Sequence, residues 1–161
     1  MKVKMFRTDD RLIHGQVMVR WVGGLGIKKI VIFDEEISKD PMLGSIFELA
    51  CPQGVELIIE SVGNAADVQA KLAGHGDQTL VLTRSPITME QVIASGFESE
   101  KGYNIGPMSN KPDTTKLAPF CYLLADEVEA LKMIHEREID IFVQTVPDAE
   151  KLIWSDLEKL F

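Results

Sequence analysis

Short apolar runs alternate along the chain with stretches in which apolar residues recur every three or four positions. The short runs are typical of buried strands, and the longer spacing is typical of helices that pack one face against a sheet. Strands are predicted at Lys2–Phe6, Lys29–Phe33, Val55–Glu60, Thr79–Thr83, Tyr103–Ile105, Phe120–Leu124 and Ile139–Thr145. Helices are predicted at Gly15–Val22, Lys39–Ala50, Ala65–Ala73, Met89–Ala94, Glu127–Glu136 and Ala149–Leu157.

Local signals set the expected ends of these elements. The Gly23–Gly24 pair is expected to end the first helix, and Pro52 the second, because glycine and proline interrupt helices. Asn64 and Thr88 are candidate N-caps. Residues 107–119 are rich in Pro, Asn, Asp and Thr, which favours an irregular loop.

The alternation of strands and helices predicts the fold class. We expect an α/β fold with a single open, mostly parallel twisted sheet of about seven strands and helices on both faces. The 161 residues, without repeat or linker, are expected to form a single domain spanning 1–161. Such sheets bind ligands outside the carboxyl ends of their strands. The loops to search are therefore Arg7–His14, Asp34–Glu36, Thr83–Ser85, Gly106–Met108 and Val146–Asp148.

The charge balance narrows the classes of partner. Lys and Arg total 17 and Asp and Glu total 25, a formal net charge of −8. This balance argues against nucleic acid and against direct docking on an anionic membrane, but it leaves room for a locally basic anion site. The chain has two cysteines in no metal-ligand spacing, no signal-peptide pattern and no long uncharged apolar run, so we expect a cytoplasmic protein with reduced thiols.

The loop after the first predicted strand concentrates the candidate chemistry. His14 precedes Gly15 at the start of a predicted helix, where free backbone N–H groups and a partial positive charge suit a phosphate. Gly15 lacks the side chain that would keep a phosphate from the backbone. Arg7 and Arg11 can donate charge-assisted hydrogen bonds to phosphate oxygens.

A histidine in this setting can act as a nucleophile. Neutral imidazole is available near pH 7, and Asp9 or Asp10 can accept the N–H of the other ring nitrogen and fix the tautomer. The residues alone leave a plainer interpretation open, in which His14 caps a helix and the Arg–Asp pairs are solvated. Neither a dinucleotide fingerprint nor a Walker loop is present, and the three histidines have no zinc spacing.

Other polar residues at predicted strand ends are weaker candidates. Asp34, Glu35 and Glu36 are expected to form a solvated turn, and Arg84 is a minor candidate for added charge near the first loop. His75 and His135 are expected to be structural rather than catalytic.

The segment RTDDRLIHGQV, followed by RWV, resembles the active-site segment of the IIB component of the mannose/fructose/sorbose family of the bacterial sugar phosphotransferase system. The resemblance continues through IVIFDEEISKDP, CPQGVELIIESV, NIGPM and DEVEALKMIHEREIDIFVQTVP, over nearly the whole chain. The RWVGGLG and FVQTVP segments look more like the N-acetylgalactosamine branch than the mannose branch.

This resemblance implies a phosphocarrier. His14 would accept a phosphoryl group on Nδ1 from a histidine of a IIA component and pass it to a sugar imported by the IIC and IID membrane components. Association with the membrane would then be peripheral and through protein contacts. The implied catalytic residues are His14, Arg11 and Asp10, and the implied phosphoryl cradle is Arg7, Asp9, Gly15 and Gln16. No cofactor and no metal is implied.

One departure and two alternatives remain. The family often has a second glycine where this chain has Pro107, which lacks an N–H, so a phosphate contact by that loop is in doubt. The first alternative is a non-catalytic module that binds a phosphorylated metabolite at the same loop. The second is a phosphoryl-transfer enzyme with a free small substrate. Whether the chain forms a homo-oligomer is left open.

Overall fold

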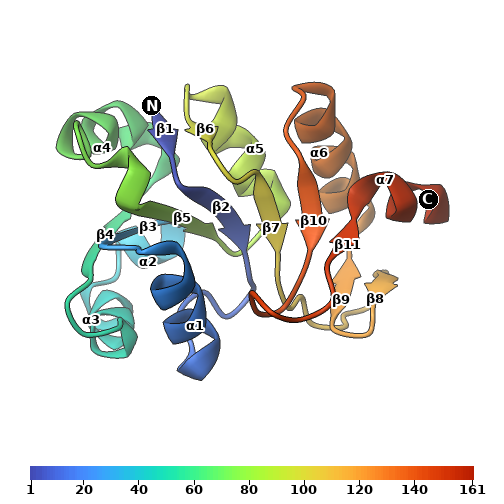
Figure 1. Cartoon of the computed structure of the whole chain (residues 1–161), viewed down its shortest axis with the longest axis horizontal. Helices are drawn as coiled ribbons and strands as arrows, with labels where there is room; N and C mark the ends of the chain where they lie inside the picture. Colours follow the sequence, from blue (N-terminus) through green and yellow to red (C-terminus); the bar gives the residue numbers. More distant parts are fainter.

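A computed structural model describes the backbone of residues 1–161 and the side chains of all of them except Gln16 and Val17. Seven strands form one main sheet (Figure 1), whose neighbouring pairs are all parallel except the last pair at one edge. In spatial order they are β4 (Glu56–Glu60), β3 (Lys29–Phe33), β5 (Thr79–Thr83), β2 (Met5–Thr8), β7 (Tyr103–Ile105), β10 (Ile141–Val143) and β11 (Leu152–Ile153).

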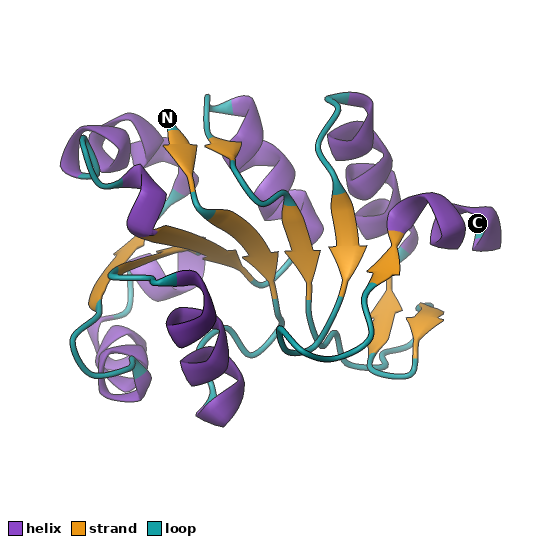
Figure 2. Cartoon of the chain, viewed as in Figure 1, coloured by secondary structure: helices purple, strands orange, loops and turns teal.

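Helices cover both faces of this sheet (Figure 2), so the predicted fold class is confirmed. One face carries α1 (Gly15–Leu25), α2 (Glu35–Ser38) and α3 (Pro41–Ala50). The other carries α4 (Ala65–Lys71), α5 (Pro86–Ala94) and α6 (Ala125–Glu136). The short α7 (Trp154–Leu157) follows β11 at the edge, and 3-10 turns lie at 62–64, 76–78 and 158–160.

The buried strands explain why both layers are needed. Along β3, Ile30 and Ile32 join the core under α1–α3, whereas Val31 and Phe33 join the core under α4–α6. Side chains of a strand alternate between the two faces, so a strand that is apolar at every position requires cover on both. The KIVIF run therefore specifies a central strand of a three-layer structure.

The strand order places a switch point beside β2. The chain runs from β2 to β3 and β4 on one side, returns to β5 next to β2, and then crosses to β7 and β10 on the other side. Connections that leave in opposite directions open a crevice at the carboxyl ends of the strands. The loop after β2 lies at this edge (Figure 1).

Two short strand pairs lie outside the main sheet. The first predicted strand is interrupted at Lys4, so that β1 (Lys2–Val3) pairs with β6 (Glu98–Ser99) while β2 enters the sheet. The prediction of a sheet strand at Phe120–Leu124 is wrong: β9 (Cys121–Leu123) pairs antiparallel with β8 (Thr115–Ala118). The supposed irregular loop contains β8, which supplies β9 with a local partner.

The C-terminal segment also differs from its prediction. Instead of a helix from Ala149, residues Leu152 and Ile153 form β11, which pairs antiparallel with Val143 and Phe142 of β10. Only Trp154–Leu157 is α-helical. Short apolar runs do not distinguish a helix from a strand by spacing alone, and here the free edge of β10 decides the outcome.

Helix α1 ends three residues later than the predicted end at Val22. Gly23 and Gly24 lie inside the helix, which ends at Leu25 and is capped by Gly26. Gly26 adopts φ 65° and donates its N–H to the carbonyl of Val22, an arrangement in which glycine avoids the steric cost of a left-handed residue. Helix α5 likewise starts earlier than expected, at Pro86, because the Ser85 side chain accepts the N–H of Ile87.

No helix within the described part of the chain has the length and apolar character needed to cross a bilayer.

Two glycine substitutions near the end of α1 should change the free energy of unfolding in opposite directions. Gly23→Ala should raise the free energy of unfolding by up to about 1 kcal/mol, because alanine favours a helix interior. Gly26→Ala should lower it by about 1 kcal/mol, because the left-handed conformation penalises a Cβ. Urea denaturation of the two variants measures both changes. Equal effects of the two substitutions would contradict the helix end described here.

Candidate active site

The loop after β2 is held at the sheet edge by its neighbours on both sides. The backbone N–H of Asp9 donates to the carbonyl of Thr83 at the end of β5, at 3.1 Å. The N–H of Asp10 donates to the carbonyl of Pro107, beyond the end of β7, at 3.2 Å. The first loop is therefore fixed across the switch point rather than free in solvent.

The loop's own apolar residues turn its polar residues outward. Leu12 and Ile13 are buried in the core under α1, whereas Arg11 is exposed. Leu12 adopts φ 57°, a left-handed conformation that is costly for leucine and is maintained by this burial. Gly15, the first residue of α1, has φ 47°. This conformation is an additional reason for glycine beside the histidine.

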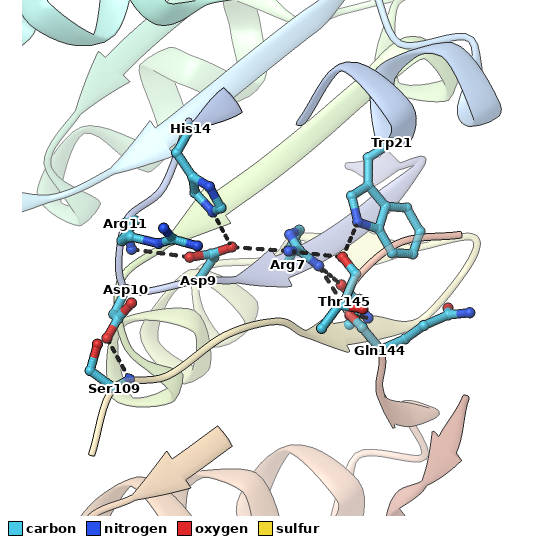
Figure 3. Close-up of polar contacts among 10 residues, drawn as sticks. Arg7, Asp9, Asp10, Arg11, His14, Trp21, Ser109, Gln144 and Thr145 are labelled. Carbon is cyan, nitrogen blue, oxygen red and sulfur yellow. Dashed lines mark hydrogen bonds and ion pairs between the residues drawn. The ribbon is translucent and has the colours of Figure 1, made fainter. Parts of the chain in front are cut away.

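Asp9 is the centre of the polar contacts (Figure 3). It is fully buried, and its Oδ2 lies 2.9 Å from Nε2 of His14. The same oxygen accepts a hydrogen bond from Nη2 of Arg7 at 3.0 Å, and Oδ1 accepts the backbone N–H of Arg11 at 3.1 Å. Both carboxylate oxygens are thus occupied, so the side chain of Asp9 is held in one orientation.

Arg7 lies beneath Asp9 and is itself fully buried. Its Nη1 donates to Oδ1 of Asn104 and to the carbonyl of Gln144, the latter at 3.3 Å. Its Nη2 also lies 3.4 Å from the carbonyl of Thr145. Burial lowers the pKa of the Arg7 guanidinium, and the Asp9 carboxylate raises it again in part. An arginine in this position carries its charge because the carboxylate and the strand-end oxygens replace water.

The hydrogen bond to Asp9 defines which nitrogen of His14 is free. A carboxylate has no proton to donate, so Nε2 of the imidazole carries the proton in this contact. In a neutral ring the lone pair then resides on Nδ1. The His14 side chain is 18% exposed, which gives the ring limited access to solvent. The site therefore presents a partly exposed imidazole whose Nδ1 takes no part in the contact with Asp9.

The predicted site residues are placed in three groups. His14 and Asp9 form the contact that the sequence suggested for Asp9 or Asp10. Asp10 instead accepts the backbone N–H of Ser109 at 2.6 Å, and this bond links the first loop to the segment after β7. Arg11, three positions before His14, and Gly15, directly after it, are exposed. The side chain of Gln16 lies outside the described residues.

Arg7 requires a correction. It was expected in the phosphoryl cradle, but its side chain is fully buried and directed at Asp9, at Asn104 of β7 and at the carbonyl of Gln144 after β10. In this arrangement Arg7 supports the site from below and has no surface open to a phosphoryl group.

Arg84, the minor candidate for added charge near the first loop, is paired with the acidic turn after β3. Its Nε and Nη2 donate to the two carboxylate oxygens of Asp34 at 2.6 and 2.9 Å, and Nη2 also lies 3.1 Å from Glu36. Asp34 in turn caps α2 by accepting the N–H of Ile37. The acidic turn after β3 therefore has its own arginine, which the prediction of a solvated turn missed.

Sequence reasoning also missed the residues that hold Arg7. Asn104, in the middle of β7, and Gln144, directly after β10, are buried polar residues among apolar neighbours, a signal that could have marked them. Trp21 is buried in the core, and its Nε1 also donates to the carbonyl of Thr145 at 2.9 Å. Its ring centroid lies 5.3 Å from Cζ of Arg7. This proximity of α1 to the strand ends is not readable from spacing.

Pro107, which has no N–H of its own, contributes a carbonyl to the loop contacts. Its oxygen accepts the N–H of Asp10, while the preceding Gly106 donates to the carbonyl of Thr8 at 2.8 Å. The described residues contain no cluster of three or more His, Cys, Asp or Glu side chains suited to a metal ion.

Comparison with known proteins identifies the family of this chain. The model of the family "PTS system sorbose subfamily IIB component" matches residues 3–160. The chain therefore belongs to this family of phosphotransferase-system IIB components, as the sequence resemblance indicated.

Individual relatives are distant but cover the whole chain. The sorbose-specific EIIB component of Lacticaseibacillus casei is 28% identical over 162 residues, which cover 100% of this chain and 98% of that protein. The mannose-specific EIIAB component of Escherichia coli (strain K12) is 26% identical over 98% of this chain, but the match spans only 48% of that longer protein. The crystal structure of manxB from Thermoanaerobacter tengcongensis is 29% identical, with a TM-score of 0.88, and the match covers 100% of this chain and 96% of that one.

The anchoring of the first loop can be tested by stability. Leu12→Ala should lower the free energy of unfolding by about 2–5 kcal/mol, because Leu12 is fully buried and alanine leaves a cavity. Leu49→Ala is the matched control: Leu49 is 88% exposed, so the change should stay within about 0.5 kcal/mol. Denaturant titration measures both. Similar small effects at the two positions would show that Leu12 does not anchor the loop.

Proposed function

We propose that this chain is a phosphocarrier in which His14 accepts a phosphoryl group on Nδ1 and passes it to a sugar. The observation that carries this proposal is the 2.9 Å contact between Nε2 of His14 and the buried carboxylate of Asp9. It supports a ring whose Nδ1 lone pair is available for attack at phosphorus. Membership of the IIB family supports a role in sugar phosphotransfer.

The donor in this proposal is the phosphohistidine of a IIA component. The Nδ1 lone pair of His14 forms the new N–P bond, while the electron pair of the donor's N–P bond stays with the donor ring. A donor ring that is protonated on its other nitrogen leaves as neutral imidazole. The His14 ring keeps its Nε2 proton and gains positive charge, which the Asp9 carboxylate stabilises at hydrogen-bond distance.

Arg11 and the start of α1 are proposed to receive the phosphoryl oxygens. Arg11 is exposed and adjoins Asp9 through its backbone N–H, so its guanidinium is free to meet an incoming anion. The first turn of α1 follows His14 directly and contains no acidic residue. Free N–H groups and the helix dipole favour a phosphoryl group there. Phosphoryl transfer needs positioning and charge stabilisation, which these groups supply.

The second transfer is proposed to go to a sugar presented by the IIC and IID membrane components. The sugar hydroxyl oxygen attacks phosphorus, its proton is released, and the N–P electron pair returns to Nδ1. With a net charge of −8, we expect peripheral docking at the membrane through protein contacts rather than through anionic lipid. Relatives named for sorbose, mannose and N-acetylgalactosamine are 28%, 26% and 24% identical, so these identities do not choose the sugar.

Replacing His14 tests the proposal. His14→Ala and His14→Gln should abolish the uptake of an acid-labile, base-stable phosphate from a phosphorylated IIA component, because no other described side chain offers this nitrogen at the site. Circular dichroism and urea denaturation check that both variants keep the fold. Continued labelling of either variant would overturn the assignment of His14. Reversible binding of a phosphorylated metabolite that survives His14→Gln, without labelling of the wild type, would favour the non-catalytic alternative.

Replacing Arg11 tests the charge stabilisation. Arg11→Ala should slow phosphoryl acceptance by about 10²- to 10³-fold, the usual cost of losing one group that stabilises transition-state charge. Arg137→Ala is the matched control, because Arg137 lies at the end of α6 and pairs with Glu90 instead of the site. Rapid-quench measurement of labelling gives both rates. Equal rates in the two variants would contradict the proposed role.

A further inference from the structure

Arg7 is a charged side chain at a position where charge is expensive. It lies on β2, at the centre of the sheet, and is fully buried with Asp9. A buried ion pair of this kind is rarely needed for stability, since apolar residues of similar size fill a core as well or better. Because Arg7 has no surface open to solvent, it also has no direct contact to offer a phosphoryl group. Any role of Arg7 in the site must therefore act through a neighbouring residue.

The contacts of Arg7 fix its guanidinium from two directions. Strand register places Arg7 opposite Asn104 of β7, and Nη1 donates to that side chain. The carbonyls of Gln144 and Thr145, which follow β10, lie 3.3 and 3.4 Å from Nη1 and Nη2. The planar guanidinium has little freedom because both Nη1 and Nη2 are held. Its contacts with β7 and with the segment after β10 therefore determine where Nη2 points.

Nη2 points at the oxygen that contacts the histidine. Oδ2 of Asp9 accepts from Nη2 of Arg7 at 3.0 Å and lies 2.9 Å from Nε2 of His14. Arg7 and His14 therefore contact the same oxygen atom, Oδ2 of Asp9. Any shift of the guanidinium moves or frees that oxygen, and the imidazole then loses the acceptor that sets its tautomer.

Gly106 provides the space that Arg7 occupies. A Cβ built on Gly106 would lie 2.6 Å from Cζ and 2.9 Å from Nη1 of Arg7. Its φ lies outside the left-handed region, so backbone conformation does not explain the glycine. The glycine is explained by the close approach of the Arg7 guanidinium, which occupies the space of a Cβ.

We propose that Arg7 is a positioning residue that, through Asp9, selects Nδ1 of His14 as the phosphoryl acceptor, and that Gly106 is required because the guanidinium fills its side-chain space. This inference rests on the proposed function of His14. A free imidazole has two neutral tautomers of similar stability, each with its lone pair on a different nitrogen. With Oδ2 held at Nε2, one tautomer prevails and Nδ1 attacks. With Oδ2 displaced, both nitrogens become acceptors.

The decisive experiment compares two glycine substitutions in the full chain. Gly106→Ala introduces the collision with Arg7 while leaving Arg7, Asp9 and His14 in place. Gly23→Ala is the matched control, because a Cβ there meets nothing within 4 Å. Each protein is labelled with a phosphorylated IIA component of a mannose- or sorbose-type system. Phosphorus NMR then separates Nδ1-phosphohistidine from Nε2-phosphohistidine, and rapid quench gives the rate.

Wild type and Gly23→Ala should yield Nδ1-phosphohistidine at equal rates. Gly106→Ala should be labelled roughly 10- to 100-fold more slowly, as expected when a reacting group is displaced by about an ångström, and should yield a mixture of the two isomers. A variant that is only less stable would be labelled on Nδ1 alone. The isomer ratio therefore separates positioning from a general structural effect.

Arg7→Lys is the second variant, and it decides the matter if Gly106→Ala does not fold. Lysine keeps a positive charge beneath Asp9, but its single ammonium group cannot hold Asp9 and the strand-end oxygens as the guanidinium fork does. It should also give mixed isomers. Unmixed Nδ1 labelling at the wild-type rate in the folded variants would overturn this inference alone. Failure of the wild type to form any phosphohistidine would overturn the proposed function and, with it, this inference.

Discussion

The buried pair of Arg7 and Asp9 is the interaction on which the geometry of the site depends. Asp9 meets Arg7 below and His14 above through the same oxygen, so the position of the imidazole follows from the position of the guanidinium. The guanidinium in turn is placed by Asn104 of β7 and by the carbonyls after β10. A sheet in which β2 lies between β5 and β7 is what brings these groups together. A short chain of hydrogen bonds thus connects the centre of the sheet to Nε2 of His14.

The proposed phosphocarrier role requires a strongly acidic chain to receive an anionic group at His14. The net charge of −8 describes the whole surface, whereas a transferred phosphoryl group responds to charges within a few ångströms in a poorly solvated site. Next to His14 stand Arg11 and the first turn of α1, and the negative charge of Asp9 is balanced by Arg7. Leu12 and Ile13, which lie in the core under α1, anchor the loop that carries these groups.

Much of this structure can be predicted from the sequence, for identifiable reasons. Lys29–Phe33 and Thr79–Thr83 were predicted to the residue because strands buried on both faces leave a clear pattern, and the short strand Tyr103–Ile105 was predicted to the residue as well. His14 and its loop were identified because charged and polar residues cluster between the first predicted strand and the first predicted helix. The prediction failed where the outcome depends on a distant partner. Ile153 becomes a strand because β10 offers a free edge, and Arg7 turns inward because Asn104, 97 positions away, accepts its hydrogen bond.

The central claim is that His14 carries its proton on Nε2, against Asp9, and leaves the lone pair on Nδ1. The most direct measurement is the two-bond ¹H–¹⁵N spectrum of the unphosphorylated chain, with ¹⁵N-labelled histidine, at a pH where the ring is neutral. His75 and His135, both exposed, serve as internal references. The account predicts the pattern of the Nε2–H tautomer for His14, with Nδ1 at the shift of an unprotonated nitrogen. A pattern of the Nδ1–H tautomer, or of rapid exchange between the two, would contradict it.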